Sequence, residues 1–586
     1  MTVRVERGQT PWGFFRRTAA FVPTVVIGSL VLPMVVTARS FGTDWTLHLW
    51  LVRQQQWNIE ALHHPGLFVS ARPLGAFNPI FAFVGSGIYS AGGYLAIVLG
   101  DRPILSYKLL YAGGLGLAYG GFTWLALQRG VRGWRAQIPG LVMVTGTYFV
   151  TDLSSRGDLG EFMAVAAIPF VTAAAYAVLR SPALRIRYVL ALVVGVFVFS
   201  GSHNITLLWG SVFFVVMTLA VAGALGRSWL KTLPIRRVLV IAGAAAIGVG
   251  LNAWYLFPDL AYGFDTAIAA TNRARVPTVV QKNGFLFGLL RPEYPIRVTV
   301  EWTFVVWAVV FVIMHRHERD RRANRLFAAV LCVGIVFVVI TGDHGAWRYL
   351  PHVLYNVQFS RRLNNYVLIT TGLLVLLALE RRGPQARRMP VAACALAVLA
   401  LFAVVCANQQ LWRVKSGYHV SGKASVFTGS SFNSTVIAAR DRVPPSWYSS
   451  FDFLDVSVPH VPVTGRRELV VPLDKLHHSS FSGVLAVPDG PLPFHTNIAG
   501  GPHFVRMTGI HAVGRNPRGF VVAARDPGAP ETGPIRVTIH LAHSGAIEWG
   551  RAVSIVSLLA LLGVVVVPPA RRYARDGRIR ETTVAA

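Results

Sequence analysis

The chain has 586 residues, of which 53% are hydrophobic and only 14% are charged. An average soluble domain carries about 25% charged residues, so this composition excludes a disordered chain and a single soluble globule. The chain has 56 Lys and Arg residues against 26 Asp and Glu residues, a formal net charge of +30. Because the basic residues gather in short clusters between apolar runs, they indicate a polytopic membrane protein and not a nucleic-acid-binding protein.

Twelve apolar runs predict membrane-spanning helices, since a helix needs about 20 apolar residues to cross the hydrocarbon core. The runs lie near 18–38, 104–128, 138–152, 161–180, 187–203, 204–224, 237–257, 301–315, 326–342, 364–380, 390–408 and 549–568. The basic clusters between them are expected on the cytoplasmic side, which places both termini there. The first run is interpreted as a retained span and not as a cleaved signal peptide.

One segment, residues 78–100, is long enough to span the membrane, but a span here would conflict with the rule that basic clusters lie on the cytoplasmic side. A span here would place the basic cluster 129–135 on the outer side. We therefore interpret it as a re-entrant or interfacial pair of helices, in which Asn78-Pro79 and the glycines break the helix. Residues 39–103 then form one long outer loop packed against the membrane face, with glycines at 85, 87, 92 and 93.

Residues 409–548 differ in composition from the apolar runs around them. They are rich in Pro, Ser and Gly and contain the alternating stretches VSVPHVPV, RGFVVAA and IRVTIHL. This pattern predicts an extracytoplasmic β-rich domain. The chain thus divides into a helical membrane module (1–408), the β-rich domain (409–548), and a final span with a basic cytoplasmic tail (549–586).

Several familiar site classes are absent from the sequence. The three cysteines lie in apolar runs without metal-ligand spacing, and there is no phosphate-binding P-loop and no nucleophile elbow. The stretch GGLGLAYGG (113–121) resembles a nucleotide loop only superficially. It lies within an apolar run, where such glycines predict close helix packing.

Asp44, in FGTDWTLHLW, follows the first predicted span on the outer side. The aromatic stretch after it, with Trp45, Trp50 and Trp57, predicts a helix that lies in the membrane interface with tryptophan anchors. Asp44 is either a carboxylate held beside a cavity or the N-cap of this helix, and the sequence leaves both interpretations open.

A second group of charges, in TDLSSRGDLGEF, lies between the third and fourth predicted spans. Asp152, Arg156, Asp158 and Glu161 crowd a membrane boundary, which is costly unless the groups pair or act. Asp158 is expected to cap the following helix, and Glu161 to point into a cavity. Arg156 is expected to pair with Asp152 or Glu161. The alternative is a solvated turn with an N-cap.

Two further outer segments carry polar residues. His203 and Asn204, in SHNIT, lie at a turn where a histidine either binds a phosphate or orients a carboxylate, or is a satisfied interfacial side chain. In YNVQFSRRLNNYV, Gln358 precedes Arg361 and Arg362. A basic pair on the outer side is an exception to the charge rule, and it predicts a phosphate clamp. The alternative is anchoring to anionic lipid head groups.

These motifs together resemble the GT-C membrane glycosyltransferases, which take sugars from polyprenyl-phosphate donors. The resemblance is greatest to the bacterial YfhO-like and 6-pyruvoyl-tetrahydropterin synthase-related membrane proteins, some from actinobacteria that build arabinan and mannan envelopes. It covers roughly residues 40–370, and the sequence departs from the family at Ser360-Arg361-Arg362, where an aromatic residue or proline is typical beside the Arg. The matching stretches are the Asp44 loop, NPIFAF (78–83), RGDLGEFMAVAAIP (156–169), SHNIT (202–206), NAWYLFPDL (252–260) and VQFSRRLNNYV (357–367).

The resemblance implies a role for each candidate residue. Asp44 would be the catalytic base, and Glu161 or Asp152 would orient the acceptor or share a divalent cation, Mg or Mn. The remaining candidates would bind the donor phosphate (Arg361, Arg362, His203 and Arg156) or the acceptor (Asn204 and Gln358).

The expected function is transfer of arabinofuranose or mannose from a polyprenyl-phosphate donor to an envelope glycan or glycolipid, at the outer face of the plasma membrane. The first alternative is a non-catalytic scaffold of envelope assembly that binds glycan. The second is a lipid or polysaccharide transporter, which would more naturally show charges inside opposed spans and paired half-repeats.

Overall fold

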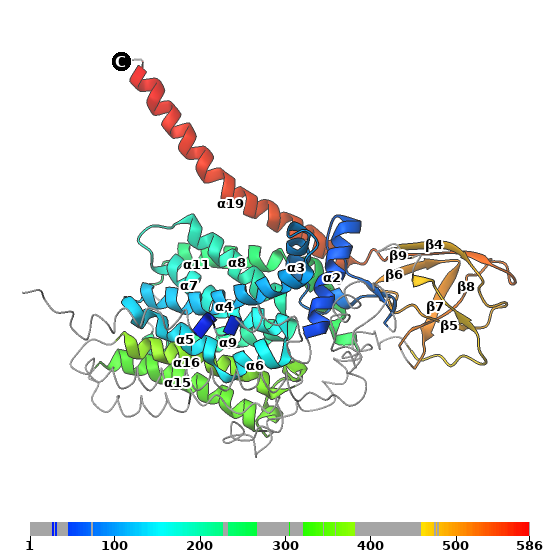
Figure 1. Ribbon diagram of the computed structural model, residues 1–586, viewed down its shortest axis with the longest axis horizontal. Helices are drawn as coiled ribbons and strands as arrows, with labels where there is room; N and C mark the ends of the chain where they lie inside the picture. Colours follow the sequence, from blue (N-terminus) through cyan, green and yellow to red (C-terminus); the bar gives the residue numbers. More distant parts are fainter. Residues whose placement is uncertain are drawn as a thin grey trace, which may run out of the picture.

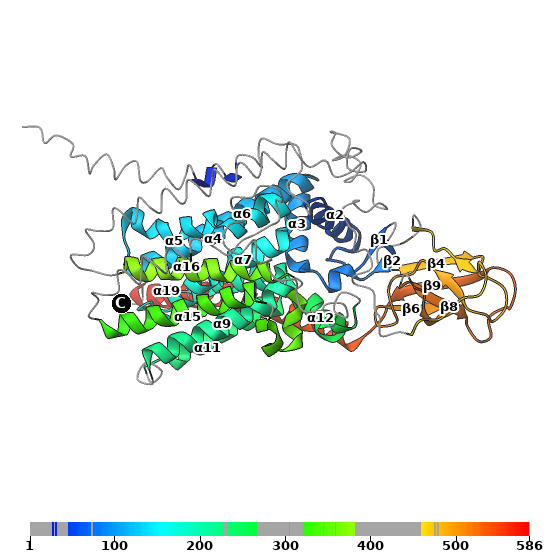
Figure 2. The ribbon, with the colours of Figure 1, turned by 90° about the horizontal axis from the view of Figure 1, so that it is seen from below.

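The computed structural model contains a bundle of helices with a group of strands at one end (Figures 1 and 2). It describes residues 26–28, 30–31, 45–71, 74–226, 232–266, 304, 320–343, 345–357, 359–380, 459–473, 476, 480–517 and 519–584. Outside these residues lie the predicted span at 390–408, the span at 301–315 except for Phe304, and most of the span at 18–38.

The helical module is built around α4 and α7, which pack along each other, and α7 also packs along α8. Glycines of the 113–121 stretch allow the first contact, because a Cβ on Gly114 would meet Phe162 and one on Gly121 would meet the backbone of Phe170. This confirms the prediction of close helix packing. The helices are α2 (Trp45–Leu62), α3 (Ser86–Val98), α4 (Pro103–Gln128), α5 (Ile138–Thr145), α6 (Thr147–Thr151), α7 (Leu159–Arg180), α8 (Ile186–Ser202), α9 (Asn204–Leu225), α11 (Ile235–Gly250), α12 (Ala253–Tyr262), α15 (Arg321–Gly342), α16 (Asn364–Leu379) and α19 (Gly545–Val584).

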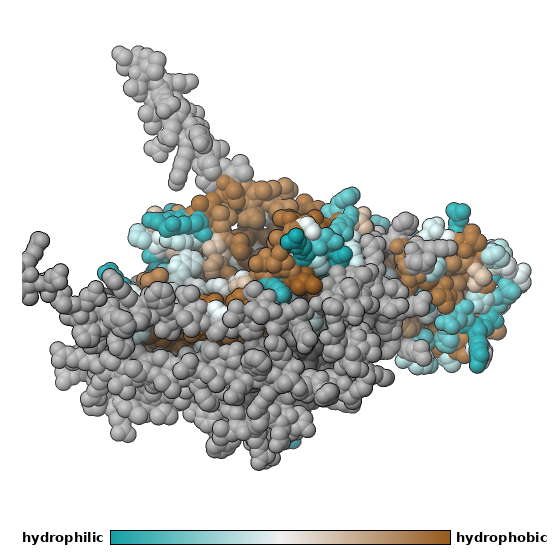
Figure 3. Space-filling view, in the orientation of Figure 1, coloured by the Kyte–Doolittle hydropathy of each residue, from teal (hydrophilic) through white to brown (hydrophobic). Residues whose placement is uncertain are grey.

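Five of the described helical segments are long and apolar enough to cross a membrane, or six if one bent pair is a single span. They are α7, α9, α15, residues 360–379 and the first half of α19, and the bent pair is α11 with α12. Apolar side chains cover much of the surface beside α19 (Figure 3). Val194 of α8, Leu239 of α11 and Leu559 of α19 are among the exposed large apolar residues. The described helices thus agree with the predicted helical membrane module, and the count of twelve spans stays a prediction.

Two predicted continuous spans are broken. The span at 138–152 is interrupted because Gly146 takes an extended conformation between α5 and α6. The span at 237–257 ends at Gly250, and α12 sets off at 79° to α11. Asn252 holds this bend, since its buried side-chain amide donates to the Phe197 carbonyl and the Ser200 hydroxyl, each over 2.9 Å.

The segment 78–100 holds one α-helix and not the expected pair of helices, and its place at a membrane face stays a prediction. The segment begins in a short strand pair, β1 (Val69–Ala71) with β2 (Gly75–Asn78), and continues through a 3-10 turn (Ile80–Ala82) into α3. Gly92 and Gly93 lie inside α3 and do not break it. They bring α2 close, because a Cβ on Gly93 would lie 2.8 Å from the Gln56 backbone nitrogen.

The expected tryptophan anchors of α2 are also corrected. Trp45, Trp50 and Trp57 are at most 6% exposed, because α2 packs against α3 and α4 instead of presenting its aromatic side chains to a membrane interface. Burial of such large side chains makes α2 part of the protein core.

The predicted β-rich domain contains two sheets. One has the order β3-β5-β8-β7 and the other β4-β9-β6. RGFVVAA supplies most of β8 and IRVTIHL is β9, as predicted, whereas the described part of VSVPHVPV forms only an isolated bridge between His460 and Arg515. The strands are β3 (Glu468–Leu469), β4 (Ser480–Leu485), β5 (Phe494–Thr496), β6 (Val505–Thr508), β7 (Ile510–Arg515), β8 (Val521–Arg525) and β9 (Ile535–Leu541).

The β-rich domain docks on the helical module through the β1–β2 segment. Ala76 pairs with Ile498, and its amide donates to the Asn497 carbonyl over 2.8 Å. Phe83 packs edge-on against Phe504 at 5.5 Å between ring centroids. Residues that were expected at the membrane face therefore form a second hydrophobic core with the β-rich domain and α12.

Candidate active site

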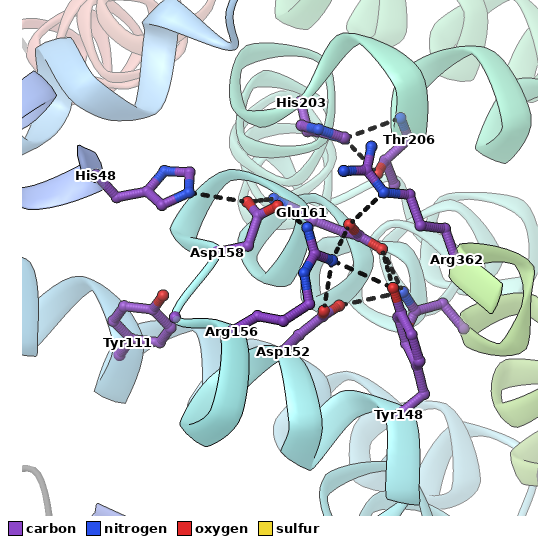
Figure 4. Close-up of polar contacts among 12 residues, drawn as sticks. His48, Tyr111, Tyr148, Asp152, Arg156, Asp158, Glu161, His203, Thr206 and Arg362 are labelled. Atoms are coloured by element: carbon purple, nitrogen blue, oxygen red, sulfur yellow. Dashed lines mark hydrogen bonds and ion pairs between the residues drawn. The ribbon is translucent and has the colours of Figure 1, made fainter. Parts of the chain in front are cut away.

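A buried cluster of charged side chains lies where several elements of the helical module meet (Figure 4). The π-helical turn Asp152–Arg156 and the start of α7 supply four of its members. His48 comes from α2, His203 from the junction of α8 and α9, and Arg362 from the 3-10 turn Ser360–Leu363 before α16. Segments far apart in the sequence thus converge on one site.

The backbone around 152–161 explains how its charges come to face one another. The π-helical turn is followed by Gly157, whose φ of 70° is a conformation that glycine adopts without strain. The chain then reverses, and the Asp158 side chain caps α7 by accepting the Glu161 amide over 3.0 Å. The predicted N-cap is therefore confirmed.

Arg156 lies at the centre of three carboxylates. Its guanidinium donates to Asp152 Oδ1 at 2.9 Å, Asp158 Oδ2 at 2.8 Å and Glu161 Oε2 at 2.7 Å. It also donates to the Tyr148 hydroxyl at 3.2 Å, and its side chain is only 7% exposed. The expected pairing with Asp152 or Glu161 is thus found with both residues.

Glu161, 1% exposed, has partners on both carboxylate oxygens. Oε1 accepts from the Tyr148 hydroxyl at 3.1 Å and from the Asn365 amide at 3.3 Å. Oε2 lies 3.2 Å from Arg362 Nε, in addition to its bond with Arg156. Neither Tyr148 nor Asn365 was predicted as a site residue from the sequence. The signal for Asn365 was its place beside Arg361 and Arg362 in the motif already singled out.

His48 and Tyr89 are two further residues that the sequence analysis missed. His48 Nε2 lies 3.5 Å from Asp158 Oδ1, and its Nδ1 lies 2.6 Å from the Tyr89 hydroxyl. His48 belongs to the FGTDWTLHLW stretch, where it is a polar residue between Leu47 and Leu49. That contrast was the only local signal for its role.

The surroundings of the turn shift the pKa values of Asp152 and Asp158 in opposite directions. Burial and the neighbouring Glu161 carboxylate raise the pKa of Asp152 well above its ordinary value. Burial would also raise the pKa of Asp158, but the positive charges of Arg156 and Arg362 outweigh it and hold that pKa well below its usual range. Asp158 is thus held ionised, whereas Asp152 favours its protonated form.

His203 caps α9 as a neutral imidazole. Burial lowers the pKa of His203 to about 4. Its Nδ1 lies 2.8 Å from the Thr206 hydroxyl and 3.2 Å from the Thr206 amide nitrogen. If Nδ1 accepts the amide hydrogen, Nε2 carries the ring proton. If Nδ1 instead donates to the hydroxyl, Nε2 presents a lone pair.

A divalent cation is one group that this site could hold. Within the described part of the chain, ligand atoms of Asp158, Glu161 and His203 lie within 4.8 Å of one another. Two carboxylate oxygens and one imidazole nitrogen suit Mn²⁺ better than Mg²⁺, which prefers oxygen ligands. The set fits only when the His203 nitrogen that faces the carboxylates carries no proton.

The remaining predicted site residues do not join this cluster directly. Asp44 and Gln358 lie outside the described residues. Arg361 stacks its guanidinium on the Phe359 ring at 4.4 Å. The Asn204 side chain donates to the Phe83 carbonyl at 3.1 Å, on the side of the β-rich domain.

Comparison with known proteins gives similar solved structures but no family. No family model and no curated protein matches the chain. The arabinofuranosyltransferase AftD from Mycobacteria aligns over 68% of this chain and 27% of its own length, at 17% identity and a TM-score of 0.39. The oligosaccharyltransferase AglB from Archaeoglobus fulgidus, in complex with an inhibitory peptide and a dolichol-phosphate, aligns over 78% of this chain, at 12% identity and a TM-score of 0.43.

A second structure of the Archaeoglobus fulgidus enzyme, in complex with Zn and sulfate, aligns at 12% identity and a TM-score of 0.38. The chain spans 27% of the length of AftD and about 60% of the length of AglB. The YfhO-like grouping and the actinobacterial source stay predictions.

Proposed function

We propose that the chain is a membrane glycosyltransferase that moves a sugar from a polyprenyl-phosphate donor to an envelope glycan or glycolipid. The sugar is arabinofuranose or mannose, and transfer takes place at the outer face of the plasma membrane. The observation that carries the proposal is the buried cluster of carboxylates and guanidinium groups at the ends of apolar helices. Such charges are costly to bury and persist where they pair or act.

Arg362 is the proposed ligand of the donor phosphate. Its Nε faces Glu161 at 3.2 Å, whereas its Nη1 is buried without a hydrogen-bond partner among the described residues. A buried guanidinium N–H that lacks a partner fits a phosphate oxygen, whose negative charge grows as the sugar leaves. Arg361, in the same turn, supplies a second positive charge close by.

The carboxylates divide the remaining roles. Asp158 is a weak base, because three donors surround it and its pKa is lowered. We propose that Glu161 orients the acceptor hydroxyl and that Asp44 removes its proton. Asp152 supports Glu161 through Asn365, to which both carboxylates lie close. A divalent cation held by Asp158, Glu161 and His203 would add positive charge at the phosphate.

Arg156 takes a different role from the one that the resemblance implied. Because its Nη atoms are bonded to three carboxylates, we propose that it positions them and does not bind the donor phosphate. Asn204 and Gln358 remain proposed acceptor-binding residues. The β-rich domain, which docks beside α12, is proposed to hold the acceptor glycan.

Membranes that contain each variant would be incubated with radiolabelled polyprenyl-phosphate arabinose or mannose and an extract of envelope acceptors. Asp44→Ala, Glu161→Gln and Arg362→Gln are expected to lose transfer at equal protein level, by about 100-fold for the arginine. Glu60→Gln is the matched control, since Glu60 is an exposed carboxylate on α2. Absence of transfer by the wild type, with full complementation of a deletion strain by Glu161→Gln, would instead favour the scaffold.

A further inference from the structure

Tyr89 and His48 form a buried series of polar contacts that ends at Asp158. The Tyr89 hydroxyl lies 2.6 Å from His48 Nδ1, and His48 Nε2 lies 3.5 Å from Asp158 Oδ1. Tyr89, His48 and Asp158 are 2%, 8% and 4% exposed. Figure 4 shows the His48 ring directed at Asp158 from α2, on the side opposite Arg362. The Tyr89–His48 pair therefore approaches the site from outside the 152–161 turn.

We propose that His48 is a positioning residue for Asp158 and that Tyr89 determines which nitrogen of His48 carries the proton. This inference rests on the proposed function and adds two residues to its site. A neutral imidazole has one N–H and one lone pair. When the Tyr89 hydroxyl donates to Nδ1, the ring proton lies on Nε2, where it faces the Asp158 carboxylate.

The consequence of losing Tyr89 follows from the same geometry. Without the hydroxyl, His48 also populates the tautomer that carries its proton on Nδ1. That form turns the Nε2 lone pair toward the ionised Asp158, which is repulsive. Asp158 would then keep only its bonds to the Glu161 amide and Arg156, both of which come from the turn itself and from α7.

The His48 and Tyr89 side chains are both held in place by packing contacts with their neighbours. The His48 and Tyr89 rings stack at 5.9 Å between centroids with an interplanar angle of 18°. Tyr89 also packs against Phe81 at 6.4 Å. The close approach of Gly93 to Gln56 fixes α3 against α2. The two helices that carry the pair are thus held rigidly with respect to each other, as a positioning role requires.

The test separates the hydroxyl from the bulk of the ring. Tyr89→Phe removes only the hydroxyl and is expected to lower kcat for transfer about tenfold, with the donor KM close to the wild-type value. Tyr94→Phe is the matched control, because Tyr94 lies on the same helix with 45% of its surface exposed. Equal kcat for Tyr89→Phe and the wild type would overturn the inference.

A double variant distinguishes positioning from a purely structural contribution. The amide of His48→Gln can donate to Asp158 without a choice of tautomer, so it is expected to retain more activity than His48→Ala. In the His48→Gln background, Tyr89→Phe is expected to cause no further loss, since Tyr89 acts through the imidazole. An equal loss in both backgrounds would show that Tyr89 serves packing only.

A measurement without transfer keeps this inference separate from the proposed function. Nitrogen NMR of histidine-labelled protein, with the His48 signals assigned by their absence in His48→Gln, is expected to show the proton on Nε2. Tyr89→Phe is expected to shift those signals toward a mixture of tautomers. A proton on Nδ1 in the wild type would refute the positioning pair. An inactive wild type with the expected tautomer would refute the transferase alone.

Discussion

Arg156→Leu tests whether the charge cluster is held together by one guanidinium. The substitution removes the bonds to Asp152, Asp158 and Glu161, each 2.9 Å or shorter, and leaves the carboxylates at most 4% exposed. Loss of one partner from a buried ion pair costs about 3–5 kcal/mol, because the remaining charge has no compensation. We expect a destabilisation of at least that order, reduced where a carboxylate takes up a proton.

Arg156→Lys refines the test. An ammonium keeps the charge, but it lacks the planar fork that contacts the three carboxylates, so an intermediate loss is expected. The thermal unfolding midpoint of detergent-solubilised protein, followed by tryptophan fluorescence, would rank the variants. Arg187→Leu serves as the control, since Arg187 is exposed and bonds only to the neighbouring Tyr188 in the described structure. Midpoints for Arg156→Leu equal to the wild type would refute the reasoning.

Three more predictions concern packing and pH. Gly85→Ala is expected to lower the unfolding midpoint strongly, because its Cβ would collide with the Ser202 carbonyl. Gly113→Ala faces open space inside α4 and should raise the midpoint slightly, because alanine favours a helix more than glycine does. Asn252→Ala should cost about 1–3 kcal/mol in denaturant unfolding, and no loss would contradict its role at the bend. The pKa of His203 is about 4 in the folded protein, below its ordinary value of 6.5. As the pH falls, His203 is therefore protonated first in the unfolded state, and the stability of the folded protein should decrease between pH 6.5 and pH 4. His203→Gln should flatten that part of a melting-point titration.

The local part of the site could be predicted from the sequence. Asp152, Arg156, Asp158 and Glu161 lie within ten residues of one another, so their mutual reach follows from the turn and the helix start. The capping role of Asp158 is equally local, because an N-cap needs only the amide three residues later. The apolar runs predicted helices for the same reason, since each run reports on a single element.

Contacts between elements that are distant in the sequence could not be predicted from it. His48, Tyr89 and Asn365 join the cluster only because the fold brings α2, α3 and α16 to the 152–161 turn. The role of a glycine also depends on distant elements. From the sequence, Gly92 and Gly93 indicate a helix break, whereas in the fold they allow α3 to approach α2.

The sequence by itself determined the class of the protein, the apolar helices, the β-rich region and the charges of the 152–161 turn, because periodicity, charge scarcity and capping act over a few residues. Only the tertiary structure decided the bend at Asn252, the docking of β2 on the β-rich domain and the contact of His48 with Asp158. Those features depend on which surfaces meet, and a neutral imidazole or amide shows its partner only once the chain has brought the two together.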